Sequence, residues 1–261
     1  MNFLFWNVNR QSIGNTIVEL VEENDIDVLI LAEYVEDIKG LLKEFSESKR
    51  AMYYYENIPH YDRLKILTSF STGHIERVKD DKHYMTLRLP HENLGFITLF
   101  AVHFFSKLHR NESDFNLKTY KFSSEVLEIE NRIGSDNTVI CGDFNMNPYE
   151  EGMISVGKLH AFPTKKEARK LKRTFDFEDY KMFYNPMWKL IGDDEILGTY
   201  HYASPHSNGL YWNIFDQVII RPALIDNFGG LTVIRNTQKT ILADENGILV
   251  SDHLPIMFSL K

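Results

Sequence analysis

Short apolar runs of strand length recur along the chain and alternate with segments that have helical spacing. The apolar runs cover residues 3–6, 28–32, 65–68, 83–89, 95–102, 138–141 and 214–220. Apolar residues three and four positions apart predict helices near residues 13–21, 38–45 and 122–133. Strands mixed with helices in this way predict an α/β protein, a four-layer α/β/β/α sandwich of two packed mixed β-sheets flanked by helices.

Polar residues stand where these apolar runs end. Glu33 follows the run at 28–32, and His103 follows the run at 95–102. Asp143 and Asn145 follow the run at 138–141, and they leave the strand on the same side because side chains alternate along a strand. Further polar residues in such positions are Asn7, Asn9, Asp216, Asp252 and His253.

Each of these residues alone also has a structural interpretation. Asp-x-Asn before a proline suits a turn, because Asx side chains bond their own backbone. A lone histidine at a strand end is most often structural. Glu33 could be a helix N-cap or a loop carboxylate. Several such clusters together indicate one shared polar site at the strand ends.

Charge and composition narrow the class of protein. The chain of 261 residues has 29 basic and 37 acidic side chains, a net charge of −8, which argues against tight, charge-driven, non-specific binding to nucleic acid. A nuclease remains possible, because bound divalent cations supply a positive field locally. No linker divides the sequence, so a single domain over residues 1–261 is expected.

The sequence carries no signal for a disulfide or a membrane span. Cys141 is the only cysteine and lies in a predicted buried strand, so no intramolecular disulfide can form. No apolar run approaches the ~20 residues that cross a bilayer. The first residues lead directly into a strand without a basic segment. A soluble cytoplasmic protein is the expectation.

Two strings make the polar pattern specific: Gly142-Asp143-Phe144-Asn145 and Ser251-Asp252-His253. With Trp6-Asn7 and Glu33, in this order over nearly the whole chain, they resemble the endonuclease/exonuclease/phosphatase superfamily. Its members include DNase-I-like nucleases, apurinic endonucleases, sphingomyelinases and inositol polyphosphate 5-phosphatases. The resemblance implies the same four-layer sandwich and a metal-dependent phosphoesterase.

Cleavage of a phosphate ester needs a nucleophilic water, neutralised charge on the phosphate oxygens and help for the leaving oxygen. The resemblance implies Mg²⁺ (or Mn²⁺) with Glu33 as its principal ligand, and Asn7 and Asp252 in its shell directly or through water. One or two carboxylates suffice for such an ion, since water and substrate phosphate complete its shell.

The resemblance also assigns the catalytic and phosphate-binding groups. Asp216 would orient His253, and this pair would act as base or phosphate contact. Asp143 would orient or deprotonate the water, which leaves open which group is the general base. Asn145 and Asn7 would bind phosphate oxygens. His103 resembles the second histidine of the nuclease and sphingomyelinase branches, which assists the phosphate or leaving group.

One residue departs from the apurinic endonuclease pattern. Asn9 stands where those enzymes usually have Asp after Trp-Asn-x. Absence of this carboxylate reduces the negative charge of the metal site. It therefore weakens the case for that subfamily and for a two-metal site.

A segment at about 157–212 is expected to be a specificity insert, because loops on a rigid scaffold carry specificity. It contains the basic stretch 165–173 followed by many aromatic residues. Lys166, Arg169 and Arg173 are predicted to contact a polyanion such as nucleic acid. The alternative is a solvated helix over a small aromatic core. The aromatic loop 53–63 could also line a groove.

Three functions are compatible with these features. A nuclease or other phosphodiesterase is favoured, because His103 and the basic and aromatic insert both suit a diester. A phosphomonoesterase acting on an inositol phosphate or another small phosphorylated molecule is the second. A catalytically silent binding module is the third, although binding alone would not need all of the charged site residues.

Overall fold

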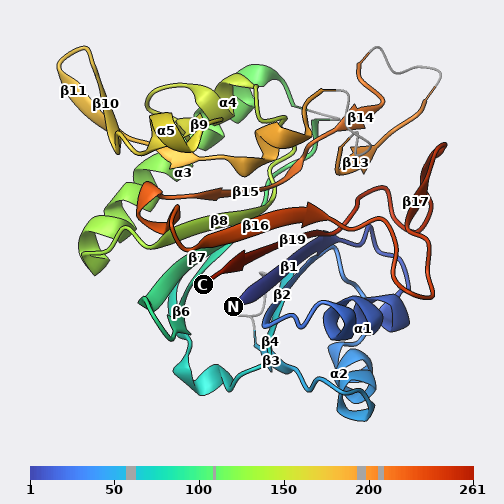
Figure 1. Ribbon diagram of the computed structural model, residues 1–261. Coiled ribbons are helices and arrows are strands. Elements are labelled where there is room, and N and C mark those ends of the chain that lie inside the picture. The colour runs from blue at the N-terminus through green and yellow to red at the C-terminus, as the bar shows by residue number, and fades with distance from the viewer. Residues whose placement is uncertain (57–62, 108–109, 193–197, 205–208) are drawn as a thin grey trace.

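The computed structural model describes residues 1–56, 63–107, 110–192, 198–204 and 209–261. Two large mixed β-sheets pack together, with helices on their outer sides (Figure 1). The predicted α/β sandwich of two packed sheets is therefore confirmed. Residues 57–62 of the aromatic loop, and residues 193–197 and 205–208 of the expected insert, lie outside the described residues.

The first sheet has six strands in the order β16-β19-β1-β2-β4-β3. Their bounds are β1 Asn2–Asn7, β2 Val28–Ala32, β3 Tyr53–Tyr55, β4 Leu64–Thr68, β16 Phe228–Val233 and β19 Ile256–Leu260. β1 is parallel to β2 and antiparallel to β19, so strands from the two ends of the chain lie side by side. Helices α1 (Gly14–Glu23) and α2 (Ile38–Glu47) bury their apolar faces in the core of this sheet.

The second sheet has seven strands in the order β5-β6-β7-β8-β15-β12-β9. Their bounds are β5 Glu76–Asp81, β6 Tyr84–His91, β7 Gly95–His103, β8 Thr138–Asp143, β9 Ala161–Phe162, β12 Phe183–Tyr184 and β15 Asp216–Ile220. Helix α3 (Glu112–Ile133) packs on its outer face through a second apolar core. It starts at Asn111 with a capping box and ends at Gly134 in the left-handed conformation.

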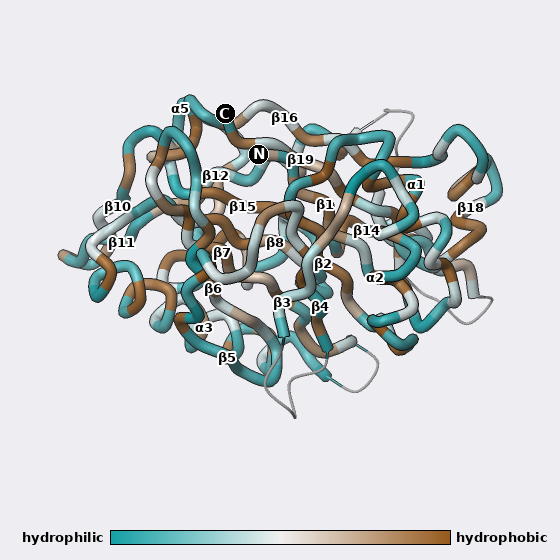
Figure 2. The backbone as a smooth tube through the Cα atoms, turned by 90° about the horizontal axis from the view of Figure 1, so that it is seen from below, coloured by the Kyte–Doolittle hydropathy of each residue, from teal (hydrophilic) through white to brown (hydrophobic). Residues whose placement is uncertain are grey.

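Alternate residues of β7 and β8 enter the two cores. Leu99 and Ala101 lie in the core shared with the first sheet, whereas Phe100 and Val102 lie in the core shared with α3. Both faces of these strands are buried, which explains their continuous apolar sequence. In Figure 2 the central strands are mostly hydrophobic, whereas many outer loops are hydrophilic.

The remaining elements are short. They are α4 Glu151–Ile154, α5 Lys165–Ala168, the β10–β11 hairpin (Lys172–Phe175, Glu178–Lys181), the β13–β14 pair (Tyr200–His201, Trp212–Asn213), the β17–β18 hairpin (Ala243–Asp244, Gly247–Ile248), and the 3₁₀ turns η1 Thr72–His74, η3 Pro186–Leu190 and η4 Pro222–Leu224. Within the described ranges, no helix has the length and apolar content to cross a membrane.

The alternative of a solvated helix over residues 165–173 is wrong. Helix α5 covers only Lys165–Ala168, and the chain then turns at Leu171, whose φ is 69°, into β10. A left-handed residue ends an α-helix, so the basic residues are divided between one helical turn and a β-hairpin.

Candidate active site

Strand pairing brings the polar strand ends to one edge of the two sheets. In the second sheet His103 pairs with Asp143 on β8, and Asp143 pairs with Asp216 on β15. In the first sheet Asn7 pairs with Ala32, the residue before Glu33. The Asn7 amide nitrogen lies 3.1 Å from an Asp143 carboxylate oxygen, so the two edges meet.

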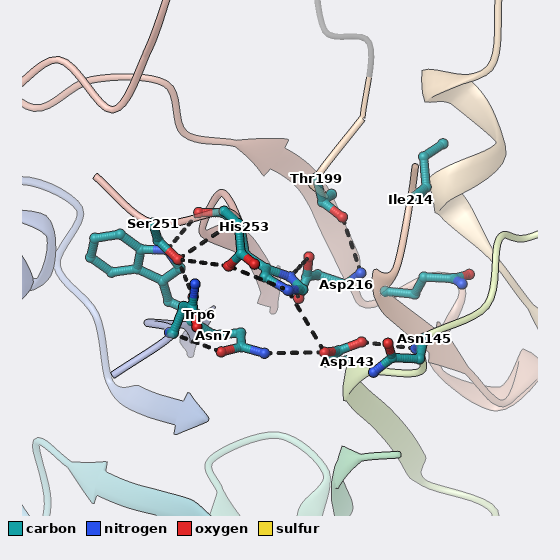
Figure 3. A network of polar contacts seen from close by, with 12 residues as sticks. Trp6, Asn7, Asp143, Asn145, Thr199, Ile214, Asp216, Ser251 and His253 are labelled. Carbon is teal, nitrogen blue, oxygen red and sulfur yellow. Dashed lines mark hydrogen bonds and ion pairs between the residues drawn. The ribbon is translucent and has the colours of Figure 1, made fainter. Parts of the chain in front are cut away.

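Asp143 is the centre of this site (Figure 3). Its Oδ2 accepts the 3.1 Å hydrogen bond from Asn7 Nδ2 and lies 3.9 Å from Nε2 of both His103 and His253. Its Oδ1 accepts a 2.8 Å hydrogen bond from the Asn145 backbone N–H. Burial raises the pKa of this carboxyl, and the two histidines oppose that effect.

The local backbone explains the Gly-Asp-Phe-Asn string. At Gly142, whose φ is 150°, a Cβ atom would lie 1.9 Å from the Val102 carbonyl oxygen, so only glycine lets β8 approach β7 here. Asn145 has a φ of 51°, a conformation that asparagine tolerates. Its side-chain amide donates to the Phe104 carbonyl at 3.3 Å, so Asn145 lies beside Asp143 within the site.

Asp216 and His253 form a buried pair. Nδ1 of His253 lies 2.8 Å and 3.0 Å from the two carboxylate oxygens of Asp216, which leaves Nε2 facing Asp143. Burial by itself lowers the pKa of His253, but Asp216, with smaller contributions from Asp143 and Asp252, outweighs it and raises that pKa to about 9. His253 is therefore a cation at neutral pH.

The Ser-Asp-His string is fixed to the end of β1. Ser251 Oγ donates to the Asn7 carbonyl at 3.0 Å and accepts from the His253 backbone N–H at 3.2 Å. Trp6 Nε1 donates to the His253 carbonyl at 3.0 Å. The Asp252 carboxylate also lies near His253, with Oδ1 3.8 Å from His253 Nε2, and the Asp252 side chain is 37% exposed.

Glu33 lies directly after β2, next to His103. Its Oε1 is 3.4 Å from His103 Nε2, and its Oε2 is 3.4 Å from Arg10 Nε. The hydrogen bond with His103 lowers the pKa of Glu33 most, and partial burial opposes it. Glu33 borders a cavity of about 570 Å³ and keeps 29% of its side chain exposed.

Two places in the site are candidates for a metal ion: the cluster of Asp143, Asp216 and His253, and the carboxylate of Glu33. Ligand atoms of Asp143, Asp216 and His253 lie within 4.8 Å of one another, but His253 Nδ1 is already bonded to Asp216 and all three residues are buried. Glu33 presents a carboxylate to an open cavity, and Mg²⁺ keeps several waters. A hydrated hard cation therefore fits better at Glu33, where His103 and Arg10 now balance its charge.

The basic residues of the insert lie far from this site. β15 starts at Asp216 in the site and ends at Ile220, and Arg169 forms a bidentate ion pair with Asp226, beyond that far end. Arg173 is in the β10–β11 hairpin, which Lys181 ties to the C-terminal end of α3. Figure 1 shows this hairpin and the β13–β14 pair on opposite sides of the molecule. Lys166, Arg169 and Arg173 therefore do not line the site.

The other part of the insert does reach the site. Thr199 Oγ1 accepts from the Asp216 backbone N–H at 3.0 Å. The Tyr200 ring lies 4.7 Å from the His253 ring and stacks with Phe215 and Tyr202. In the sequence Tyr200 is only one of many aromatic residues of the insert, and nothing there shows which of them packs on His253.

The two packed sheets have the fold of solved endonuclease/exonuclease/phosphatase proteins, the fold that the resemblance implied. Three solved structures illustrate this similarity. The AP endonuclease from Archaeoglobus fulgidus has a TM-score of 0.59 and 14% identity, covering 100% of this chain and 99% of that chain. A family protein from Leptotrichia buccalis has a TM-score of 0.61 and 13% identity, with the same coverage of 100% and 99%. The 3′ phosphatase NExo from Neisseria, bound to product DNA hairpin, has a TM-score of 0.60 and 10% identity, again covering 100% and 99%.

These identities are low, and what they show is the fold. No protein-family profile matches the chain, and no curated protein matches it in sequence. The chemistry therefore has to be argued from the residues of the site.

Proposed function

We propose that this protein is a divalent-metal-dependent phosphoesterase that cleaves phosphodiesters, with nucleic acid as its substrate class. The observation that carries the proposal is the arrangement around Asp143. One oxygen of this buried carboxylate lies 3.9 Å from two histidines and 3.1 Å from an amide donor. A phosphoryl group needs such a combination of a base with cationic and neutral donors.

Each residue has a role that its contacts support. Asp143, whose pKa burial raises, is suited to orient and deprotonate the attacking water. His253, held protonated by Asp216, is suited to donate from Nε2 to a phosphate oxygen. Asn7 orients Asp143, and Asn145 adds a neutral donor beside it. His103 lies between Asp143 and Glu33, where it can assist the leaving oxygen.

Glu33 is the residue best placed to hold Mg²⁺ or Mn²⁺, with Asn7 and Asp252 as secondary or water-mediated partners. When bound, such an ion neutralises charge on the phosphate oxygens. Asn9 contributes no carboxylate here, so the chain offers less negative charge than a two-metal site would use.

Two observations support nucleic acid over other diesters. Tyr200, Tyr202 and Phe215 form a stacked aromatic row beside His253, and base stacking on aromatic rings is a general device for binding single strands. The Neisseria structure of the same fold contains a DNA product. Because that protein is a 3′ phosphatase, a phosphomonoesterase is the second candidate for this chain.

The test is a screen of the purified protein with and without Mg²⁺ or Mn²⁺. Its substrates are single- and double-stranded DNA, RNA, bis-p-nitrophenyl phosphate and inositol phosphates. Metal-dependent cleavage of a diester is expected, and an Asp143→Asn variant should lose activity by a factor on the order of 10² to 10⁴. Release of phosphate from monoesters alone would favour the second candidate. No metal-dependent cleavage of any ester would refute the proposal.

A further inference from the structure

We propose that the cavity beside Glu33 is a second anion-binding subsite, in which Arg10 and Arg63 hold a phosphate group next to the one that is cleaved. The inference rests on the proposed phosphodiesterase function and adds to it a substrate class. The preferred substrate carries at least two neighbouring phosphates, as an oligonucleotide with a terminal phosphate does.

The cavity has the size and position for this role. Its volume is about 570 Å³, which lies within the usual range of ligand sites, and its walls include Arg10, Tyr34, Arg63 and Phe105. Glu33 and His103 also line it, and His103 Nε2 lies 3.9 Å from Asp143. A group bound there is therefore adjacent to the reacting phosphate.

The two arginines have guanidinium groups that can bind a ligand. Arg63 is exposed and forms no ion pair or hydrogen bond through its side chain with any described residue. The side chain of Arg10 is 73% exposed. Among the described residues its one partner is Glu33, with Arg10 Nε 3.4 Å from Glu33 Oε2. In a chain of net charge −8, two such cations on one cavity favour an anion. The planar fork of arginine suits phosphate in particular.

Backbone hydrogen bonds fix both arginines to Glu33. The Arg10 N–H donates to the Glu33 carbonyl at 3.2 Å, and the Glu33 N–H donates to the Arg63 carbonyl at 3.2 Å. The backbones of the three residues thus form a connected unit, and the side chains of both arginines line the cavity with Glu33. Their relative positions are set by the main chain, which pre-organises the subsite.

The same unit contains unusual backbone conformations. Asn9, Arg10 and Glu33 have φ values of 43°, 59° and 55°, in the left-handed region that disfavours most side chains. Glycine would adopt the Arg10 conformation without strain. A long charged side chain at this strained position, pointing to the cavity, agrees with a functional use of the guanidinium.

The strain also provides a variant that separates binding from folding. Arg10→Gly removes the guanidinium and relaxes the backbone, so its melting temperature should equal or exceed that of the wild type. Arg63→Ala removes the second cation. Arg132→Ala on α3 is the matched control, because Arg132 is also exposed and belongs to neither the cavity nor the site.

The experiment compares the dinucleotide TpT with pTpT and TpTp, which carry one more phosphate on either side. In the wild type, one phosphorylated form should have a higher kcat/KM than TpT. In Arg10→Gly and Arg63→Ala the ratio of kcat/KM for this form to kcat/KM for TpT should fall by about tenfold or more, because a charged hydrogen bond is lost. Arg132→Ala should keep the wild-type ratio. Equal ratios in all four proteins would overturn the subsite.

Equilibrium binding of the same dinucleotides in EDTA tests the subsite without turnover. The preferred phosphorylated form should bind the wild type about tenfold more tightly than it binds Arg63→Ala. If the wild type binds it in this way but cleaves nothing with metal, the proposed function fails and the subsite stands. If cleavage occurs while both variants bind as the wild type does, the subsite fails and the function stands.

Discussion

At the scale of single residues, the site depends on opposite charges that are buried together. Asp143, Asp216 and His253 are almost inaccessible to solvent, and the cationic His253 offsets the cost of burying the two carboxylates, which repel each other. Removing one member leaves a buried charge without its partner. The variants that test the site should therefore keep the size and shape of the replaced side chain as far as possible.

The first prediction concerns the protonation of His253. Its pKa is raised from 6.5 to about 9, so the pair with Asp216 contributes stability in full below pH 6.5 and loses it as the pH rises through 9. Asp216→Asn should lower this pKa markedly. Asp252→Asn should lower it less, because Asp252 is a smaller contributor. An NMR titration of the imidazole measures both, and equal shifts would contradict the assignment of Asp216 as its partner.

The second prediction concerns the joint action of His253 and Asp216. Groups that act as one unit lose activity together, so the double variant His253→Ala/Asp216→Asn should be scarcely slower than His253→Ala alone. The measurement is kcat/KM on bis-p-nitrophenyl phosphate for the two single variants and the double variant. Losses that multiply would show that the two residues act separately.

At the scale of elements, the approach of β7 to β8 positions His103 beside Asp143. Gly142 makes this approach possible, since a Cβ there would lie 1.9 Å from the Val102 carbonyl oxygen. A third prediction follows: Gly142→Ala should destabilise the fold by roughly 2–4 kcal/mol, as expected for a backbone clash in the core. Gly95→Ala is a useful comparison, because Gly95 also has a positive φ but no atom near its Cβ position. Similar denaturation midpoints for the two variants would contradict the role of the close approach.

The sequence predicted most of the long elements because they bury a clear apolar pattern, whereas the six-residue strands β5 and β16, which are mostly unburied, were missed. β1, β2, β7 and β8 and helices α1 and α2 agree with the predicted runs, whereas α3 begins at Glu112, ten residues before the predicted helix near 122–133. The short strands β9 to β14 were not predicted, since two to four residues carry little periodicity. The alternative of a solvated helix over residues 165–173 failed because tertiary pairing with β11 fixes residues 172–175 in a hairpin.

The site was predictable where a motif marked it. Asp143, Asp216 and His253, with Asn7 and Asn145, meet at one strand end, as the superfamily resemblance implied. Arg10 and Arg63 could not be found in this way. Their proximity to Glu33 comes from loop backbone bonds between distant segments, which leave no local pattern in the sequence.

At the scale of the whole molecule, charge is distributed unevenly around an acidic chain. The basic residues of 165–173 lie at the far end of β15, and Arg169 is paired with Asp226. A polyanion could touch both this region and the site only if it were long. Any contribution of Lys166 and Arg173 to the binding of nucleic acid therefore depends on the length of the strand.

The fourth prediction makes this dependence measurable. In the double variant Lys166→Glu/Arg173→Glu, affinity for a long single strand should fall relative to affinity for a trinucleotide. The salt slope for the long strand should also flatten, by roughly one unit for each phosphate that the variant no longer neutralises. The measurement is the dissociation constant of each ligand over a range of salt concentrations. An unchanged ratio and slope would show that these residues are only solvated surface.

The central claim is that a metal ion held at Glu33 makes this arrangement a phosphodiesterase. The most direct measurement is the rate of bis-p-nitrophenyl phosphate hydrolysis as Mn²⁺ or Mg²⁺ is titrated into the wild type and into Glu33→Gln, which keeps the size of the side chain and removes its charge. The wild type should be inactive in excess EDTA and show saturable activation by the metal. Glu33→Gln should be slower by roughly a hundredfold or more and need more metal. Full activity of Glu33→Gln, or turnover by the wild type in excess chelator, would contradict the account.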